Sequence, residues 1–204
     1  MKRVTILLGL LLLLAPLAAW ADGITIGNQS GTITFSTAGV VSTNSELTNY
    51  NGTRAPSQQA MGYVNFTTGG FNGPSAGLWT GGSFSSQGSS FLIEGIGKFG
   101  APKGVIFNGA FVGPISWTVV SKSHTNYVFE LSGELAGVLG NGTDVTGTTT
   151  QTIFANTGQW PHDHKGAIHI GSTNLVVPEP GTLGLLGTGL IGIAGIMRRK
   201  LTEL

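Results

Sequence analysis

The stretch GTITFS, residues 31–36, decides the fold of this chain because its side chains alternate in character. The apolar residues Ile33 and Phe35 are each followed or preceded by a threonine. A period of two places successive side chains on opposite faces of a β-strand, so one face is expected to be buried. The stretch YVFELSG, residues 127–133, begins with a similar pattern.

Short runs rich in β-branched and aromatic residues recur along the chain, separated by glycine, asparagine, proline and serine. Between residues 22 and 176, no run shows the 3.6-residue period of an amphipathic helix. The predicted strands cover residues 31–36, 62–67, 89–95, 105–112, 115–121, 127–133, 144–154 and 167–176, with weaker candidates at 24–27, 77–84 and 134–139.

Asparagine–glycine pairs predict where these strands turn, since both residues tolerate a positive φ. The strongest hairpin signal is Asn141-Gly142, because β-like runs flank it on both sides. Turns are also expected at residues 51–52, 72–73 and 108–109, and residues 43–59 are expected to form a long exposed loop. Strands with this spacing predict an all-β domain: we favour an antiparallel β-sandwich, with a closed β-barrel as the alternative.

The composition supports a folded β domain and excludes some functions. Glycine accounts for 34 of 204 residues, charged residues for 9% and hydrophobic residues for 40%. Residues 22–176 hold five basic and seven acidic residues, a formal charge of −2, so nucleic-acid binding is not expected. The chain has no cysteine, which excludes disulfides and thiolate metal sites.

The amino end, residues 1–21, has the three parts of a secretory signal peptide. Two basic residues precede an apolar run that is too short to span a bilayer comfortably. Ala19 and Ala21 fit the small-residue positions of a signal peptidase site. Cleavage there leaves Asp22 as the new amino terminus.

The carboxyl end, residues 177–204, begins with VPEPGTLGLLGTGLIGIAGIMRRK. Residues 181–197 are uncharged and mostly apolar, and as a helix they would extend roughly 26 Å, near the short limit for a transmembrane span. The positive-inside rule predicts that the basic cluster of Arg198, Arg199 and Lys200 stays in the cytoplasm. The two ends therefore agree on export of residues 22–176, with a signal helix before this domain and a transmembrane helix after it.

Pro178, Glu179 and Pro180 stand directly before the apolar segment, and the two prolines favour an extended backbone that a protease can bind. The order of triplet, apolar helix and basic end resembles the PEP-CTERM sorting signal of Gram-negative bacteria. The resemblance implies that a membrane-embedded exosortase recognises the triplet and cuts near it. It further implies retention by the basic cluster before the cut, and later delivery to the cell surface or extracellular matrix.

Two binding sites are weighed as alternatives. His162 and His164 would share one face of a strand and, with His169, could bind a metal ion, although a polar surface loop explains them as well. Aromatic residues near glycine-rich loops, Phe71, Trp79 and Trp160, could stack on sugar rings if they lie exposed on one face.

The sequence thus predicts a non-enzymatic structural protein of the cell surface or extracellular matrix, without a cofactor. Its expected partners are signal peptidase, exosortase, the membrane and exopolysaccharide. The alternative is a secreted module that binds carbohydrate or metal. A hydrolase is less favoured, since it needs clustered acids or a serine–histidine pair, and the G-x-S-x-G match at residues 73–77 lacks a following helical pattern.

Overall fold

The computed structural model describes residues 23–123, 126–156 and 164–177. In this part the chain forms strands and one short 3₁₀ helix, η1. The elements are β1 (Gly23–Ser36), β2 (Gly39–Tyr50), β3 (Thr53–Arg54), β4 (Gly62–Thr67), η1 (Ser75–Trp79), β5 (Gly82–Phe84), β6 (Ser90–Ile96), β7 (Lys103–Lys122), β8 (Asn126–Leu139), β9 (Asp144–Asn156) and β10 (Lys165–Val176). The predicted all-β class is confirmed for these residues.

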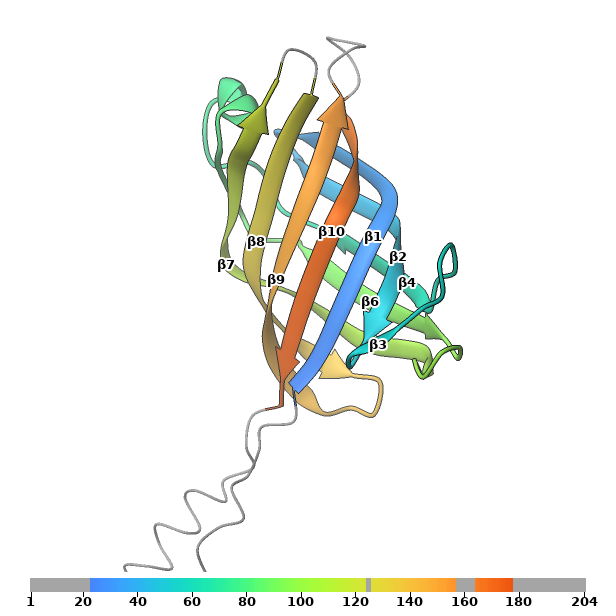
Figure 1. The fold of residues 1–204 in the computed structure, drawn as a ribbon. Coiled ribbons are helices and arrows are strands. Elements are labelled where there is room, and N and C mark those ends of the chain that lie inside the picture. The colour runs from blue at the N-terminus through green and yellow to red at the C-terminus, as the bar shows by residue number, and fades with distance from the viewer. Residues whose placement is uncertain (1–22, 124–125, 157–163, 178–204) are drawn as a thin grey trace, which may run out of the picture. The chain divides into compact units, whose positions relative to one another are not determined.

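The strands form a closed antiparallel barrel of eight strands (Figure 1). Around the ring the order is β1, β10, β9, β8, β7, β6, β4 and β2, and β2 pairs with β1 to complete it. The short strands β3 and β5 lie outside the ring, paired with β2 and β7. The predicted sandwich is therefore wrong and its alternative, the closed barrel, is the fold.

Closure explains why a barrel replaces the sandwich. Each barrel strand pairs with the barrel strand that follows it in the chain, as in an up-and-down meander, and the first and last strands meet along their length. The register runs from Gly23 opposite Val176 to Thr34 opposite Lys165. With this pairing no ring strand has a free edge, and the apolar face of the sheet is buried inside the ring and not against a second sheet.

Several strands are longer than the sequence pattern predicts. The runs 105–112 and 115–121 belong to one strand, β7, which bends at a bulge between Val112 and Ser116, where Gly113 has a φ of 72°. The turn expected at residues 108–109 is wrong, because both residues pair inside β7. The loop expected at residues 43–59 is wrong in its first half, which belongs to β2.

Two asparagine–glycine turns are confirmed. Asn141-Gly142 connects β8 to β9: the Asn141 side chain accepts a hydrogen bond from the Thr143 amide at 3.0 Å. Asn51-Gly52 connects β2 to β3 with φ values of 48° and 80°. Positive φ at both positions is what a type I′ hairpin turn requires, and asparagine followed by glycine adopts it at the least cost.

The barrel interior is mainly apolar, and the alternation seen in residues 31–36 accounts for it. Ile33 and Phe35 are 0% and 2% exposed, while the threonines between and before them face outward. One aromatic cluster in the interior lies around Trp117, which stacks on Phe129 with ring centroids 4.4 Å apart. A second lies between β4, β6 and β7, and includes the parallel rings of Phe66 and Phe91.

The segment between β4 and β6 packs onto the first cluster. It carries η1 and β5, and Figure 1 shows η1 at the end of the barrel where β7 passes to β8. Leu78 in η1 is buried, and its carbonyl accepts a hydrogen bond from the Trp117 indole N–H at 2.9 Å. The weak strand predicted at residues 77–84 is wrong in its first part, because only Gly82–Phe84 are extended.

A polar network lies inside the barrel between β1, β2, β9 and β10. Asn28 donates from its amide nitrogen to Ser45 Oγ at 2.8 Å and to Gln151 Oε1 at 2.9 Å. Gln151 donates to Thr149 Oγ1 at 2.8 Å, and a hydrogen bond of 2.9 Å links that hydroxyl to Thr173. All five side chains are buried. Because buried amides are costly without partners, this network favours the observed register of the four strands around it.

Gly171 makes room for the network, since a Cβ there would collide with the amide oxygens of Gln151 and Asn28. We therefore expect Gly171→Ala to lower the free energy of unfolding by about 1–3 kcal/mol, the usual cost of overpacking a core. Urea denaturation followed by circular dichroism measures it. The matched control is Gly23→Ala in β1, where the new Cβ meets its nearest atom at 3.7 Å. Equal stability of the two variants would contradict the prediction.

In the part of the chain that the structure describes, no helix is long and apolar enough to cross a membrane. The predicted signal helix and the predicted transmembrane helix at residues 181–197 both lie outside the described residues.

Candidate functional site

The predicted processing sites flank the barrel in the sequence. The cleavage residues Ala19, Ala21 and Asp22 lie outside the described residues, as do the triplet at 178–180 and the basic cluster at 198–200. The structure does describe where the barrel begins and ends between them. The first residue of β1, Gly23, pairs with the last residue of β10, Val176. Along the chain, both predicted processing sites therefore lie outside the paired strands.

The histidines predicted as metal ligands have different surroundings. His162 lies outside the described residues. The His164 ring stacks on Phe35 with centroids 5.4 Å apart, and its Nδ1 is 3.0 Å from the Phe35 carbonyl oxygen. His169 is exposed on β10, where it stacks on Phe154. The described residues contain no group of three or more histidines, cysteines and acids that could hold a metal ion, so the metal site stays a prediction.

The aromatic residues predicted to stack on sugars do not form an exposed platform. Phe71 and Trp79 are partly buried and pack against the hydrophobic core. Trp79 contacts Tyr127 edge-on with ring centroids 5.0 Å apart, and Phe71 contacts Phe84 at 5.1 Å. Trp160 lies outside the described residues. The structure therefore uses Phe71 and Trp79 for packing, and a sugar site needs another location.

The acidic residues of β8 point away from the barrel interior. Glu130 faces Thr118 and Thr152 across the neighbouring strands, and Glu134 faces Val112 and Thr148. Neither lies opposite a second carboxylate in the strand register.

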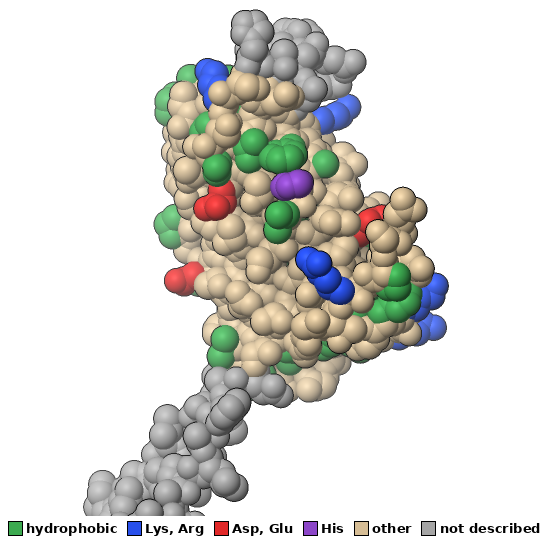
Figure 2. All heavy atoms as spheres, in the orientation of Figure 1, with side chains coloured by type: hydrophobic (Ala, Val, Ile, Leu, Met, Phe, Trp, Pro, Cys, Tyr) green, Lys and Arg blue, Asp and Glu red, His purple; other side chains and the backbone are tan. Residues whose placement is uncertain are grey.

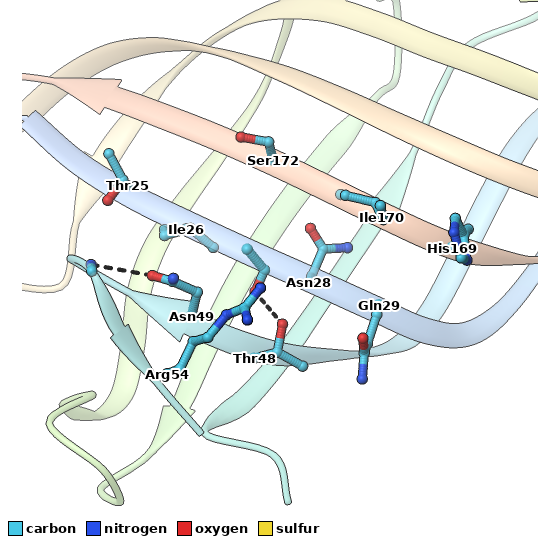
Figure 3. A pocket seen from close by; sticks show the side chains of 13 residues that line it. Thr25, Ile26, Asn28, Gln29, Thr48, Asn49, Arg54, His169, Ile170 and Ser172 are labelled. Carbon is cyan, nitrogen blue, oxygen red and sulfur yellow. Dashed lines mark hydrogen bonds between the residues drawn. The ribbon is translucent and has the colours of Figure 1, made fainter. Parts of the chain in front are cut away.

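The barrel surface has a groove where β1 lies between β2 and β10 (Figure 3). Its volume is about 360 Å³. The strand register shifts next to Asn28 on both sides of β1, and such irregularities interrupt the regular hydrogen-bond ladder. Gly27 forms part of the floor, because it presents no side chain between Asn49 on β2 and the backbone of β10.

The groove is lined mainly by polar side chains from four strands. Thr25 and Gln29 come from β1, Asn49 from β2, Arg54 from β3 and Ser172 from β10. Figure 3 shows Arg54 reaching from β3 toward β1, with Asn49 beside it. None of the lining residues is acidic. Sequence reasoning missed this groove, because it depends on β1 contacting β10, a pairing between the two ends of the domain.

Beside the groove, the outer face of the barrel has an apolar patch of Val128, Phe154, Ala167 and Ile170. Val128 and Ala167 lie opposite Phe154 on its two neighbouring strands, and Ile170 is 60% exposed. Figure 2 shows hydrophobic side chains gathered around a histidine on this face. His169 stacks on Phe154 with centroids 4.3 Å apart, so this patch joins the groove at His169 and Ile170.

Comparison with known proteins finds a family match at the carboxyl end of the chain. Residues 176–200 match the family model of the PEP-CTERM protein-sorting motif. No curated protein and no solved structure matches the chain. The match begins at Val176, the last residue of β10, so the motif follows the barrel directly. The motif and the triplet within it identify the chain as a PEP-CTERM protein, an exported protein with an exosortase-dependent sorting signal.

Proposed function

We propose that this chain is a non-enzymatic structural protein of the cell surface or extracellular matrix, delivered there after an exosortase cuts its tail. Signal peptidase removes residues 1–21, and the apolar helix at 181–197 holds the exported domain at the inner membrane until the cut. The observation that carries the proposal is the sorting motif at residues 176–200. It specifies a route of delivery, and the barrel is the part that is delivered.

The barrel suits a protein that acts by persisting outside the cell. Its ring strands are all paired on both sides, and its interior is closely filled with apolar and aromatic side chains. It needs no disulfide, since the chain has no cysteine. Removing the tail near the triplet would leave every barrel strand intact, because β10 ends at Val176.

The route is tested by the intact mass of the protein in the envelope and the medium, in the parent host and in a host that lacks its exosortase. We expect loss of both ends in the parent and of only the amino end in the deletion strain. An uncut tail in both strains would show that the tail is a plain membrane anchor, and the proposal would lose its main support.

A matched pair of tail variants tests recognition of the triplet. Glu179→Ala changes the centre of the triplet, while Glu203→Ala removes the same charge beyond the matched residues. We expect Glu179→Ala to leave nearly all of the protein uncut in the membrane fraction, and Glu203→Ala to be processed like the parent. Mass spectrometry of the membrane and released fractions distinguishes the two. Normal processing of Glu179→Ala would rule out recognition through this carboxylate.

A further inference from the structure

The groove between β1, β2 and β10 has a chemistry that restricts which ligands it can bind. Arg54 is exposed on β3, and the structure gives its guanidinium no carboxylate partner among the described residues. Glu46 lies opposite Gln29 in the strand register and does not line the groove. A guanidinium offers a planar set of five N–H donors that matches a carboxylate, so the groove favours an anionic group.

The remaining lining suits a ligand that carries many hydroxyls. The Asn49 side-chain oxygen accepts a hydrogen bond from the Gly52 amide at 3.1 Å, which leaves its amide NH₂ as a donor. Thr25, Gln29 and Ser172 add exposed groups that can both donate and accept hydrogen bonds. On the β10 side, the exposed Ile170 offers an apolar surface against which the C–H face of a sugar ring can pack.

The strand pairing argues against a peptide as the ligand. β1 is paired with both β2 and β10, and β10 is paired with both β1 and β9. An extended peptide gains much of its affinity by adding to a free strand edge; β1 and β10 offer none at the groove, and β3, which is paired only with β2, has just two residues. Recognition must therefore pass through side chains, which is how polyhydroxylated ligands are bound.

We propose that this groove binds a carboxylated polysaccharide, with Arg54 pairing with a sugar carboxylate and Asn49, Gln29 and Ser172 binding hydroxyls. The groove is at the small end of the about 300–1,000 Å³ typical of ligand sites, so it holds a short stretch of the polymer. Binding is weak at one site and is strengthened when many copies of the protein meet one polymer. The inference rests on the proposed function only for the location in which the protein meets the polysaccharide. The contacts with the polysaccharide all belong to the barrel.

The test uses the purified full chain in detergent, with equilibrium binding measured at low ionic strength to immobilised polygalacturonate. Arg54→Gln is expected to weaken binding about tenfold or more, the loss that accompanies removal of one charge-assisted pair. Lys122→Gln is the matched control: it removes the same charge from the end of β7, which pairs with neither β1, β2 nor β10, and is expected to bind like the parent.

A third variant tests the shape of the groove separately from the charge of Arg54. Gly27→Thr fills the floor while Arg54 stays in place, and it is expected to weaken binding to a similar extent. Thermal unfolding of each variant confirms that the barrel is intact. If Gly27→Thr fails to fold, Arg54→Gln still tests the proposal, because Arg54 is exposed.

Two further polymers test the class of ligand. Dextran carries hydroxyls without carboxylates, and polyglutamate carries carboxylates without sugar rings, so both are expected to bind more weakly than polygalacturonate. Equal binding of either polymer would overturn the proposal, as would absent binding of polygalacturonate or parent-like binding by Arg54→Gln or by a folded Gly27→Thr. Since the assay does not depend on tail cleavage, its failure is distinguishable from failure of the sorting route.

Discussion

A chain of residues 22–165 is expected to lose the folded barrel, whereas a chain of residues 22–177 is expected to keep it. The shorter chain lacks nearly all of β10, which pairs with β9 on one side and with β1 on the other. It also lacks Ile168 and Leu175, which are 3% and 1% exposed in the barrel. Burial of each such side chain contributes about 1.5–3 kcal/mol, against a total stability of about 5–15 kcal/mol for a typical domain.

The loss extends beyond the deleted residues. Without β10, the paired edges of β1 and β9 open, and the buried network loses the hydroxyl of Thr173. Open strand edges favour association between molecules, so the shorter chain is expected to aggregate. Circular dichroism, size-exclusion chromatography and amide hydrogen exchange compare the two chains. A cooperative, monomeric barrel from residues 22–165 would contradict the closed fold.

The stability of the chain of residues 22–177 also bears on sorting. If this chain unfolds like the full chain, the tail contributes nothing to the stability of the barrel. The cell can then fold the exported domain first and cut the tail later without loss of structure. If the chain instead loses stability, cutting near the triplet would itself destabilise the delivered protein. That result would argue against a structural role outside the cell.

The local features of the barrel could be predicted from sequence because they depend on neighbouring residues. The alternation around Ile33 and Phe35 and the turn at Asn141-Gly142 both follow from local backbone geometry. A β-sandwich and a β-barrel both have strands in which buried and exposed side chains alternate. They differ in whether the first strand meets the last, here the contact between Gly23 and Val176, and no local pattern encodes it.

The full length of the strands could not be predicted for a related reason. Glycine and proline at residues 113–114 predict a break between two strands, and the structure accommodates them as a bulge within β7. A bulge and a turn share the same local residues, and only the partner strand distinguishes them. The buried amide of Gln151 did leave a signal, since it shares the inward phase of Val145, Thr149 and Ile153 along β9.

The candidate sites also differ in whether they could be predicted from local sequence. The sorting triplet could be found from sequence, because a protease reads a contiguous extended segment and its signal is linear. The groove could not, because its walls come from strands that are far apart in the chain: Arg54 and Ser172 are separated by most of the domain. The aromatic residues predicted to bind sugar illustrate the difficulty, since Phe71 and Trp79 pack against the core.

Trp117→Ala is expected to destabilise the barrel more than Gly171→Ala does. The side chain of Trp117 is 1% exposed and contacts the rings of Phe129, Phe84 and Phe35. Replacing a buried large aromatic residue by alanine usually costs about 3–5 kcal/mol. The substitution also leaves the Leu78 carbonyl without the indole N–H, which adds about 1–3 kcal/mol if water does not replace that donor.

Trp117→Phe compares packing with the hydrogen bond, because it keeps one aromatic ring in the core but removes the indole N–H together with the rest of the indole ring. We expect it to cost less than half as much as Trp117→Ala. Denaturant unfolding of the two variants and the parent, followed by far-ultraviolet circular dichroism, gives both free energies. Equal loss in both variants would mean that the hydrogen bond to η1 matters more than the ring packing. A loss below about 1 kcal/mol for Trp117→Ala would contradict a tightly packed core, since even a single buried methylene contributes nearly that much.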